Sequence, residues 1–223
     1  MRALRTSASL VAAVAIAATT AGAQSASRPA ATPARAAARV LPASAAAAPA
    51  PVLAAYQIDA AHSELSFRIR HLLGRVSGGF GEWGGTIAID SATPANSRVD
   101  VTIKTASTDT KNANRDQHLR SNEFFAADSF PTITFRSTKV AVRGQALTVH
   151  GDLTIRGRTR PVVLTGEYAG AFRDAYGKQR TAFTAATTIN RLDYGVTWNK
   201  AVETGAMLGD DVTIAIAIEA VRQ

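Results

Sequence analysis

Apolar and polar residues alternate along several stretches of this chain, and this period of two is the feature that most limits its fold. In the runs around Phe67, Val101 and Ile214, every second residue is apolar. Successive side chains of a strand point to opposite faces, so the pattern predicts strands with one apolar and one polar face. Turn-forming residues separate the runs at short intervals, as antiparallel connections require. Long amphipathic helices and βαβ spacing are not found, so we do not expect a parallel sheet.

About eight such strands predict either a β-sandwich or a closed β-barrel. A sandwich fills its interior with side chains, whereas a barrel of about eight strands can leave room for one small ligand. The segment from Gly74 to Gly85 is rich in glycine, and glycine permits the bulges and bending that closure requires. A plain glycine-rich loop is the alternative. We therefore predict an all-β fold, an eight-stranded antiparallel barrel with one short helix between strands.

The predicted helix covers residues 115–125, which read RDQHLRSNEFF and precede an alternating strand that ends at Phe135. Asp116 and Arg120 are four residues apart, as in an exposed ion pair on a helix. Such a helix could carry catalysis, bind a metal or cover one end of the barrel.

The first 23 residues follow the pattern of a secretory signal peptide, with Arg2 and Arg5, a short apolar run and a small-x-small cleavage site. This run is too short for a membrane-spanning helix, although an uncleaved anchor is the alternative. Residues 24–55 are dominated by Ala, Pro, Ser, Thr and Arg, which predicts a disordered tether. We therefore expect a periplasmic protein, exported through a cleaved signal peptide, whose single folded domain covers residues 56–223.

Charge and cysteine content exclude several classes of protein. The formal net charge is +8, but residues 56–223 contain 20 basic and 17 acidic residues and so contribute only +3. This mixed balance does not favour nucleic acid as a partner. The chain contains no cysteine, which excludes disulfides, thiol catalysis and thiolate metal sites.

The four histidines do not have the spacing of a metal-binding helix motif, so we expect no metal. His118, with Asp116 nearby, is the best candidate for a functional histidine. The triplet at residues 62–64, His-Ser-Glu, cannot form a catalytic triad by itself because neighbouring strand residues point to opposite faces. A GxSxG motif is not found, and Asp210 and Asp211, the only adjacent acids, are interpreted as a turn.

Three arginines, Arg156, Arg158 and Arg160, lie close together in the sequence near a predicted turn. They could bind a phosphate, or they could form the solvated tip of a hairpin. With these residues considered, we expect neither an enzyme nor a bound cofactor.

Five motifs in this order resemble the YceI-like family: YQIDAAHSELSFRIRH, GGFGEWGGTIAID, RDQHLRSNEFF with FPTITF, LTVHGDLTIRGRTRPVVL and TINRLDYGV. Members of this family are bacterial, often periplasmic, polyisoprenoid-binding proteins with a lipocalin-like barrel. The chain departs from the family's pattern at Ala60, where proline is usual, at Ala126 and Ala127, where the pattern is more acidic, and at Tyr194, where phenylalanine is frequent. The resemblance covers nearly all of residues 56–223.

The resemblance implies an apolar bore that holds an isoprenoid chain. We expect the bore to be lined by Phe67, Ile69, Trp83, Val101, Ile103, Phe125 and Phe135. The helix would cover or line one end of the barrel, with Arg115 and His118 near a polar head group. A helix that caps the core without touching ligand is the alternative.

The expected function is therefore the non-enzymatic binding or transport of an isoprenoid lipid, such as a quinone or a polyprenyl phosphate. Two alternatives stay open: an enzyme that acts on a lipid-like substrate, and a filled barrel that serves as a protein-interaction module. We expect an isoprenoid or another long apolar small molecule as partner, no nucleic acid and no stable membrane insertion. The oligomeric state, including a homodimer, is left open.

Overall fold

The computed structural model describes residues 53–202 and 205–223. The predicted signal peptide and all but the last three residues of the predicted tether lie outside the described residues. Ala54 and Ala55 belong to the first strand, where they pair with Ile89 and Ala88, so the folded part begins two residues before Tyr56.

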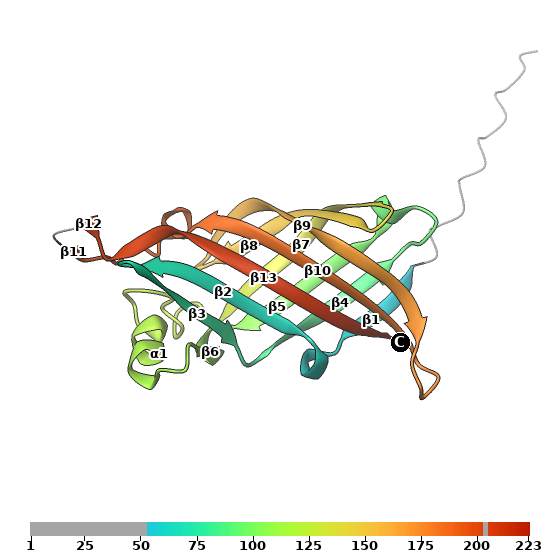
Figure 1. Ribbon diagram of the computed structural model, residues 1–223, viewed down its shortest axis with the longest axis horizontal. Helices are drawn as coiled ribbons and strands as arrows, with labels where there is room; N and C mark the ends of the chain where they lie inside the picture. The colour runs from blue at the N-terminus through green and yellow to red at the C-terminus, as the bar shows by residue number, and fades with distance from the viewer. Residues whose placement is uncertain (1–52, 203–204) are drawn as a thin grey trace, which may run out of the picture. The chain divides into compact units, whose positions relative to one another are not determined.

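The described residues form β-strands and short helices (Figure 1). The strands are β1 (Ala54–Ile58), β2 (Glu64–His71), β3 (Gly74–Phe80), β4 (Trp83–Ile89), β5 (Arg98–Lys104), β6 (Thr108–Asp109), β7 (Thr132–Arg143), β8 (Ala146–Ile155), β9 (Arg158–Arg173), β10 (Gln179–Asn190), β11 (Ala201–Val202), β12 (Gly205–Ala206) and β13 (Leu208–Arg222). The helices are α1 (Ala113–Arg120) and the 3₁₀ turns η1 (Ala60–His62), η2 (Pro94–Asn96), η3 (Thr105–Ser107) and η4 (Arg191–Tyr194).

Eight strands close into a ring in the order β1, β4, β5, β7, β8, β9, β10 and β13, because β1 pairs with both β4 and β13. All of these pairings are antiparallel. Along β13, Arg222 pairs with Tyr56 of β1, whereas Leu208 pairs with His71 of β2. Both β1 and β2 therefore pair with β13, β2 along its first part and β1 at its end. The 3₁₀ turn η1 lies between the two strands in the chain. The predicted eight-stranded antiparallel barrel is confirmed.

Glycines of the β3 and β4 region allow the barrel wall to pack closely. A Cβ atom on Gly85 would lie 2.1 Å from the carbonyl oxygen of Asp100 on the neighbouring strand. A Cβ atom on Gly78 would lie 2.6 Å from the ring of Phe67. These glycines therefore belong to strands rather than to a loop, and their missing side chains let backbone and ring approach.

The helix differs from its prediction, because α1 begins at Ala113 and ends at Arg120 instead of continuing to Phe125. Asn112 caps its first turn, and its side chain accepts a hydrogen bond from the Arg115 amide at 3.0 Å. Ser121 then adopts an extended conformation, and its hydroxyl accepts a hydrogen bond from the Glu123 amide. A serine that bonds the local backbone in this way competes with helix continuation.

The predicted exposed ion pair between Asp116 and Arg120 is wrong. Asp116 is buried, and its carboxylate accepts hydrogen bonds from the amide and the hydroxyl of Thr110 at 2.9 and 2.6 Å. The carboxylate thus attaches α1 to the segment that follows β6. Asp210 and Asp211 are also not in a turn, since both lie within β13, where the register shifts between Leu208 and Val212.

None of the helices in the described ranges is long and apolar enough to cross a membrane.

Candidate ligand-binding cavity

The barrel encloses a cavity of about 490 Å³. Its lining is almost entirely apolar and comes from side chains of the barrel strands and of β2 and β3, together with α1 and the turns near it. This volume lies within the range of about 300–1,000 Å³ that is usual for small-molecule sites. Within the described part of the chain, therefore, the bore is not filled by side chains meeting across it.

The structure brings all nine residues predicted for the ligand site to the wall of this cavity. They are Phe67, Ile69, Trp83, Val101, Ile103, Arg115, His118, Phe125 and Phe135. The strand residues among them could be found because alternation places every second side chain on the inner face. Phe125 reaches the cavity from the turn after α1, not from the helix itself.

One end of the cavity is apolar and packed shut. Ile58 and Ile218 line the cavity there. Beyond them, Tyr56, Ile87 and Ala220 are buried in one cluster and do not line it. These side chains fill the bore and form a blind end.

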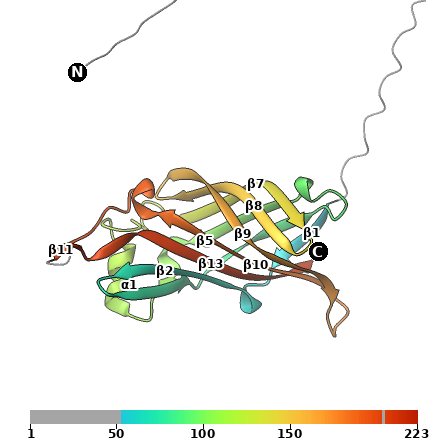
Figure 2. The ribbon, with the colours of Figure 1, turned by 45° about the horizontal axis from the view of Figure 1, so that its top comes forward.

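Polar residues gather at the other end, where α1 lies (Figures 1 and 2). Arg115 donates hydrogen bonds to the hydroxyl and the carbonyl oxygen of Thr110, at 2.7 and 2.9 Å. His118 pairs with Glu123, with 2.5 Å between Nε2 and Oε2, and its ring lies edge-on to Phe124 and Trp198. The cavity is therefore amphipathic, with an apolar blind end and a polar mouth.

A sequence comparison identifies the protein's relatives. The profile of the YceI-like domain matches residues 56–220. The chain belongs to the YceI-like family. A UPF0312 protein of Photorhabdus laumondii is 38% identical to it over 171 residues, which cover 75% of this chain and 86% of the relative.

Solved structures of similar fold agree with the membership of this chain in the YceI-like family. The YceI protein of Campylobacter jejuni superposes with a TM-score of 0.61 and 32% identity, over 74% of this chain and 96% of that protein. A polyisoprenoid binding domain from Saccharophagus degradans superposes with a TM-score of 0.57 and 17% identity, over 77% of this chain and all of that domain. The second likeness concerns the fold alone.

Arg191, which follows β10 in the YceI-like motif TINRLDYGV, was not singled out by the sequence analysis. It lines the cavity, is 4% exposed and ion-pairs with Asp210 at 3.1 Å. Its guanidinium also donates to the carbonyl oxygens of Gly209, Val196 and Trp198. Arg191 thus fixes the segment that carries Trp198 to the start of β13. Only its place in the motif could have indicated this role.

Tyr194 lies in the same motif, at the position where YceI-like proteins frequently have phenylalanine. It lines the cavity and is 2% exposed. Its hydroxyl has no hydrogen-bond partner among the described residues. Burial, together with the negative charge of Asp193, raises the pKa of Tyr194 to about 12. The hydroxyl therefore stays protonated and can donate a hydrogen bond.

The arginines of the GRTRP region have two different environments, and their binding of a phosphate stays a prediction. Arg156 is half-buried and donates to the carbonyl oxygens of Phe124 and Gly195, at 2.6 and 3.0 Å. Arg158 and Arg160 are exposed at the beginning of β9, where they pair with Ile155 and Leu153 of β8. Arg156 therefore lies in the hairpin turn itself and joins the turn after α1 to the turn after η4, whereas the other two are exposed residues of the β9 strand.

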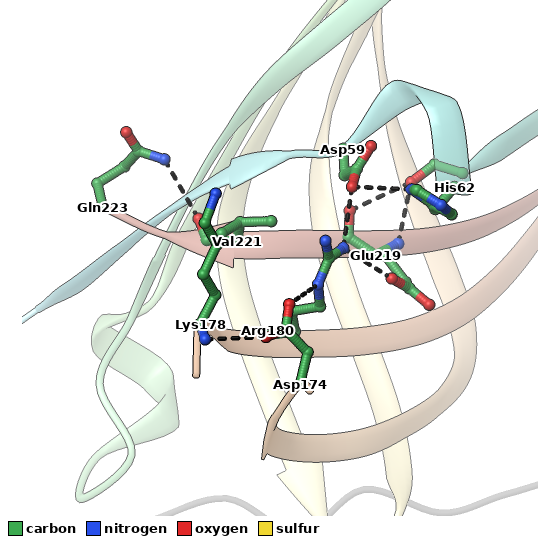
Figure 3. Close-up of polar contacts among 9 residues, drawn as sticks. Asp59, His62, Asp174, Lys178, Arg180, Glu219, Val221 and Gln223 are labelled. Carbon is green, nitrogen blue, oxygen red and sulfur yellow. Dashed lines mark hydrogen bonds and ion pairs between the residues drawn. The ribbon is translucent and has the colours of Figure 1, made fainter. Parts of the chain in front are cut away.

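A network around Arg180 joins four segments at the blind end (Figure 3). Arg180 at the start of β10 pairs with Asp59, Asp174 and Glu219 at 2.9, 2.8 and 3.0 Å. Hydrogen bonds from this guanidinium lower the pKa of both Asp59 and Asp174. His62 also contacts Asp59, with 2.9 Å between Nδ1 and Oδ2. This network stabilises the barrel wall and lies far from the polar mouth.

Proposed function

We propose that this protein binds an isoprenoid lipid in its barrel cavity and carries it in the periplasm without converting it. The observation that carries the proposal is the amphipathic cavity, which is about 490 Å³ in volume, apolar along its wall and blind at one end. An isoprenoid tail fits such a space because it offers only apolar surface. The signal-peptide pattern of the first 23 residues supports the periplasmic location.

The driving force is burial of the tail. Each CH₂ group removed from water contributes about 0.8 kcal/mol, so one five-carbon isoprene unit contributes about 4 kcal/mol before the costs of ordering and association. A cavity lined by rigid strands reduces those costs, because the site exists before the ligand arrives.

The polar mouth supports a ligand with an oxygen-bearing head. Arg115 and His118 are cavity-lining groups that can donate hydrogen bonds to a quinone carbonyl or to a phosphate. The polyisoprenoid binding domain of Saccharophagus degradans, which shares the fold, supports the same ligand class. We therefore place the head of a quinone or polyprenyl phosphate at the α1 end and its tail at Ile58 and Ile218.

One observation favours the enzyme alternative, namely the His118–Glu123 pair at the cavity wall. A histidine oriented by a carboxylate can act as a general base. His118→Ala tests this alternative by turnover assays with quinone and prenyl phosphate substrates. Under the binding proposal, the variant shows the same lack of turnover as wild type, and any His118-dependent turnover supports the enzyme.

Both tryptophans of the chain, Trp83 and Trp198, line the cavity, so their fluorescence reports directly on its occupation. We expect a short-chain ubiquinone to quench this fluorescence with saturation, because the quinone lies beside the indole rings when bound. Phe67→Asp should abolish the saturable quenching by placing a charge in the apolar bore. Ala185 of β10 also lines the cavity, and Ala185→Phe should abolish the quenching by filling the bore.

Phe172→Ser is the matched control, because Phe172 is 46% exposed and does not line the cavity. The tryptophan fluorescence of this variant should be quenched by the quinone as that of wild type is. Circular dichroism of each variant shows whether the barrel is intact. If the folded Phe67→Asp and Ala185→Phe variants were quenched like wild type, the quinone would bind elsewhere and the proposal would fail.

A further inference from the structure

The tip of the β2–β3 hairpin exposes two leucines to solvent. Leu73 is 100% exposed and Leu72 is 37% exposed, and they follow one another in the chain. Leu72 also has a φ of +51°, in the left-handed region that normally favours glycine. A large apolar residue in this conformation is unfavourable locally, so the local backbone alone does not account for a leucine at this position.

Hydrogen bonds hold this tip in place. The amide of Leu72 donates to the carbonyl oxygen of Met207 at 2.8 Å, and the Arg70 guanidinium donates to the carbonyl oxygen of Leu72 at 3.2 Å. The backbone of the tip is thereby fixed to the segment before β13. The leucines are presented outward instead of folding back onto the barrel.

Positive charge surrounds the tip. Arg68, Arg70 and Arg75 are exposed on β2 and β3, and none of them has an ion-pair partner among residues 53–202 and 205–223. On the neighbouring strand β13, Asp210 is already paired with Arg191, and Asp211 is exposed. Exposed leucines within a group of arginines suit the surface of an anionic bilayer, which attracts the cations and takes up the apolar side chains.

The tip lies at the polar mouth of the cavity. His71, which precedes Leu72, and Met207, which accepts its hydrogen bond, both line the cavity. Another strongly exposed apolar side chain, Tyr176 at 89% exposure, lies at the opposite end, where Arg180 pairs with Val221 of β13. The two ends of β13 are about 45 Å apart, given the rise of a strand over its 15 residues.

We propose that the Leu72–Leu73 tip docks this protein on the surface of an anionic phospholipid bilayer, with the cavity mouth facing the membrane. Leu72 and Leu73 enter the interface, and Arg68, Arg70 and Arg75 contact lipid phosphates. The use of this docking for loading or delivering a ligand rests on the proposed function, but the docking itself depends only on the tip.

The first test is co-flotation of the full chain with vesicles of phosphatidylcholine and phosphatidylglycerol, beside vesicles of phosphatidylcholine alone. The protein should float with the anionic vesicles, and less so as salt screens the charges. Leu73→Ser should weaken partitioning about tenfold, because the variant lacks the leucine side chain that the bilayer would bury. Arg75→Gln should weaken it about fivefold. Arg143→Gln, at an exposed arginine on β7, and Tyr176→Ser are the controls and should partition as wild type does.

The second test uses the absence of cysteine from the chain, which makes a single introduced cysteine unique. Gly74→Cys preserves both leucines, and a Cβ at Gly74 meets only an ordinary contact with the His71 carbonyl oxygen, at 3.7 Å. A polarity-sensitive fluorophore there should shift to the blue with anionic vesicles, whereas the same label on Tyr176→Cys should not. Equal shifts at both sites, failure of the wild type to float, or unchanged flotation of Leu73→Ser would overturn the proposal.

Quinone binding in solution separates this proposal from the proposed function. Leu73→Ser should retain the saturable tryptophan quenching, and Phe67→Asp should lose quenching but still float with anionic vesicles. If quenching were absent in wild type while the tip-dependent flotation remained, the docking would stand and the ligand proposal would fall. If quenching remained while wild type failed to float, the ligand proposal would stand and the docking proposal would fall.

Discussion

Arg180 shows how single residues determine the pH dependence of this barrel. Its hydrogen bonds lower the pKa of Asp59 and Asp174 in the folded protein. Below the unfolded aspartate pKa of about 3.9, the folded state then binds fewer protons than the unfolded state. The stabilisation is complete above about pH 5 and is lost as the pH falls through the folded pKa values.

We therefore expect Arg180→Gln to lower the free energy of unfolding at pH 7, because Asp59, Asp174 and Glu219 then face one another without a cation. The gap from wild type should shrink as the pH falls below about 3.9, because wild type then loses the stabilisation that the lowered pKa values of Asp59 and Asp174 provide. Urea denaturation at a series of pH values measures the gap, with Arg143→Gln as a control at an exposed arginine. A gap that stays constant over this range would show that Arg180 acts through packing instead of charge.

The buried hydroxyl of Tyr194, which has no partner among the described residues, also affects the stability of the protein. A buried hydroxyl without a partner costs about 1–3 kcal/mol, so Tyr194→Phe should raise the free energy of unfolding of the ligand-free protein by about 1 kcal/mol. Chemical denaturation of protein extracted free of lipid measures this difference. A loss of stability would instead mean that the hydroxyl has a partner in solution, such as a bound water.

At the scale of elements, the mouth of the cavity depends on contacts between turns more than on α1 itself. Arg156 joins the turn that carries Phe124 to the turn that carries Gly195. We expect Arg156→Ala to increase amide hydrogen exchange in residues 121–130 and to speed the release of bound quinone, because two charged, half-buried hydrogen bonds to carbonyl oxygens are lost.

Arg160→Ala is the matched control for that variant, since within residues 53–202 and 205–223 the Arg160 side chain donates only to the neighbouring Thr159 carbonyl oxygen. Its exchange and release rates should equal those of wild type. Unchanged protection of residues 121–130 in Arg156→Ala would show that other contacts hold the mouth closed.

The elements could be predicted to different degrees. Strands such as β10 and β13 were evident because alternation is a local property, and it also gave the inward faces that carry Phe67 and Phe135. The end of α1 was missed because it depends on the conformation of Ser121. The buried place of Asp116 depends on Thr110, and the pairing of Arg180 with Asp59 joins residues 121 positions apart, which a pattern of near neighbours cannot show.

At the scale of the whole barrel, the two ends have different physical character. Tyr56, Ile87 and Ala220 pack the bore shut at one end, and Arg180 ties the wall there. The other end has the polar mouth and the exposed leucines of the β2–β3 tip. This asymmetry suits the proposed ligand class, because an amphipathic molecule would lower its free energy by placing its tail in the apolar end and its head at the polar end.

In our proposal, this asymmetric cavity holds an isoprenoid lipid. Native mass spectrometry of protein purified without detergent from a bacterial periplasm, followed by organic extraction, tests it most directly. We predict a complex whose added mass matches an isoprenoid quinone or a polyprenyl phosphate, and the same mass should be missing from Ala185→Phe. Clean apoprotein that also takes up no added isoprenoid would contradict the claim.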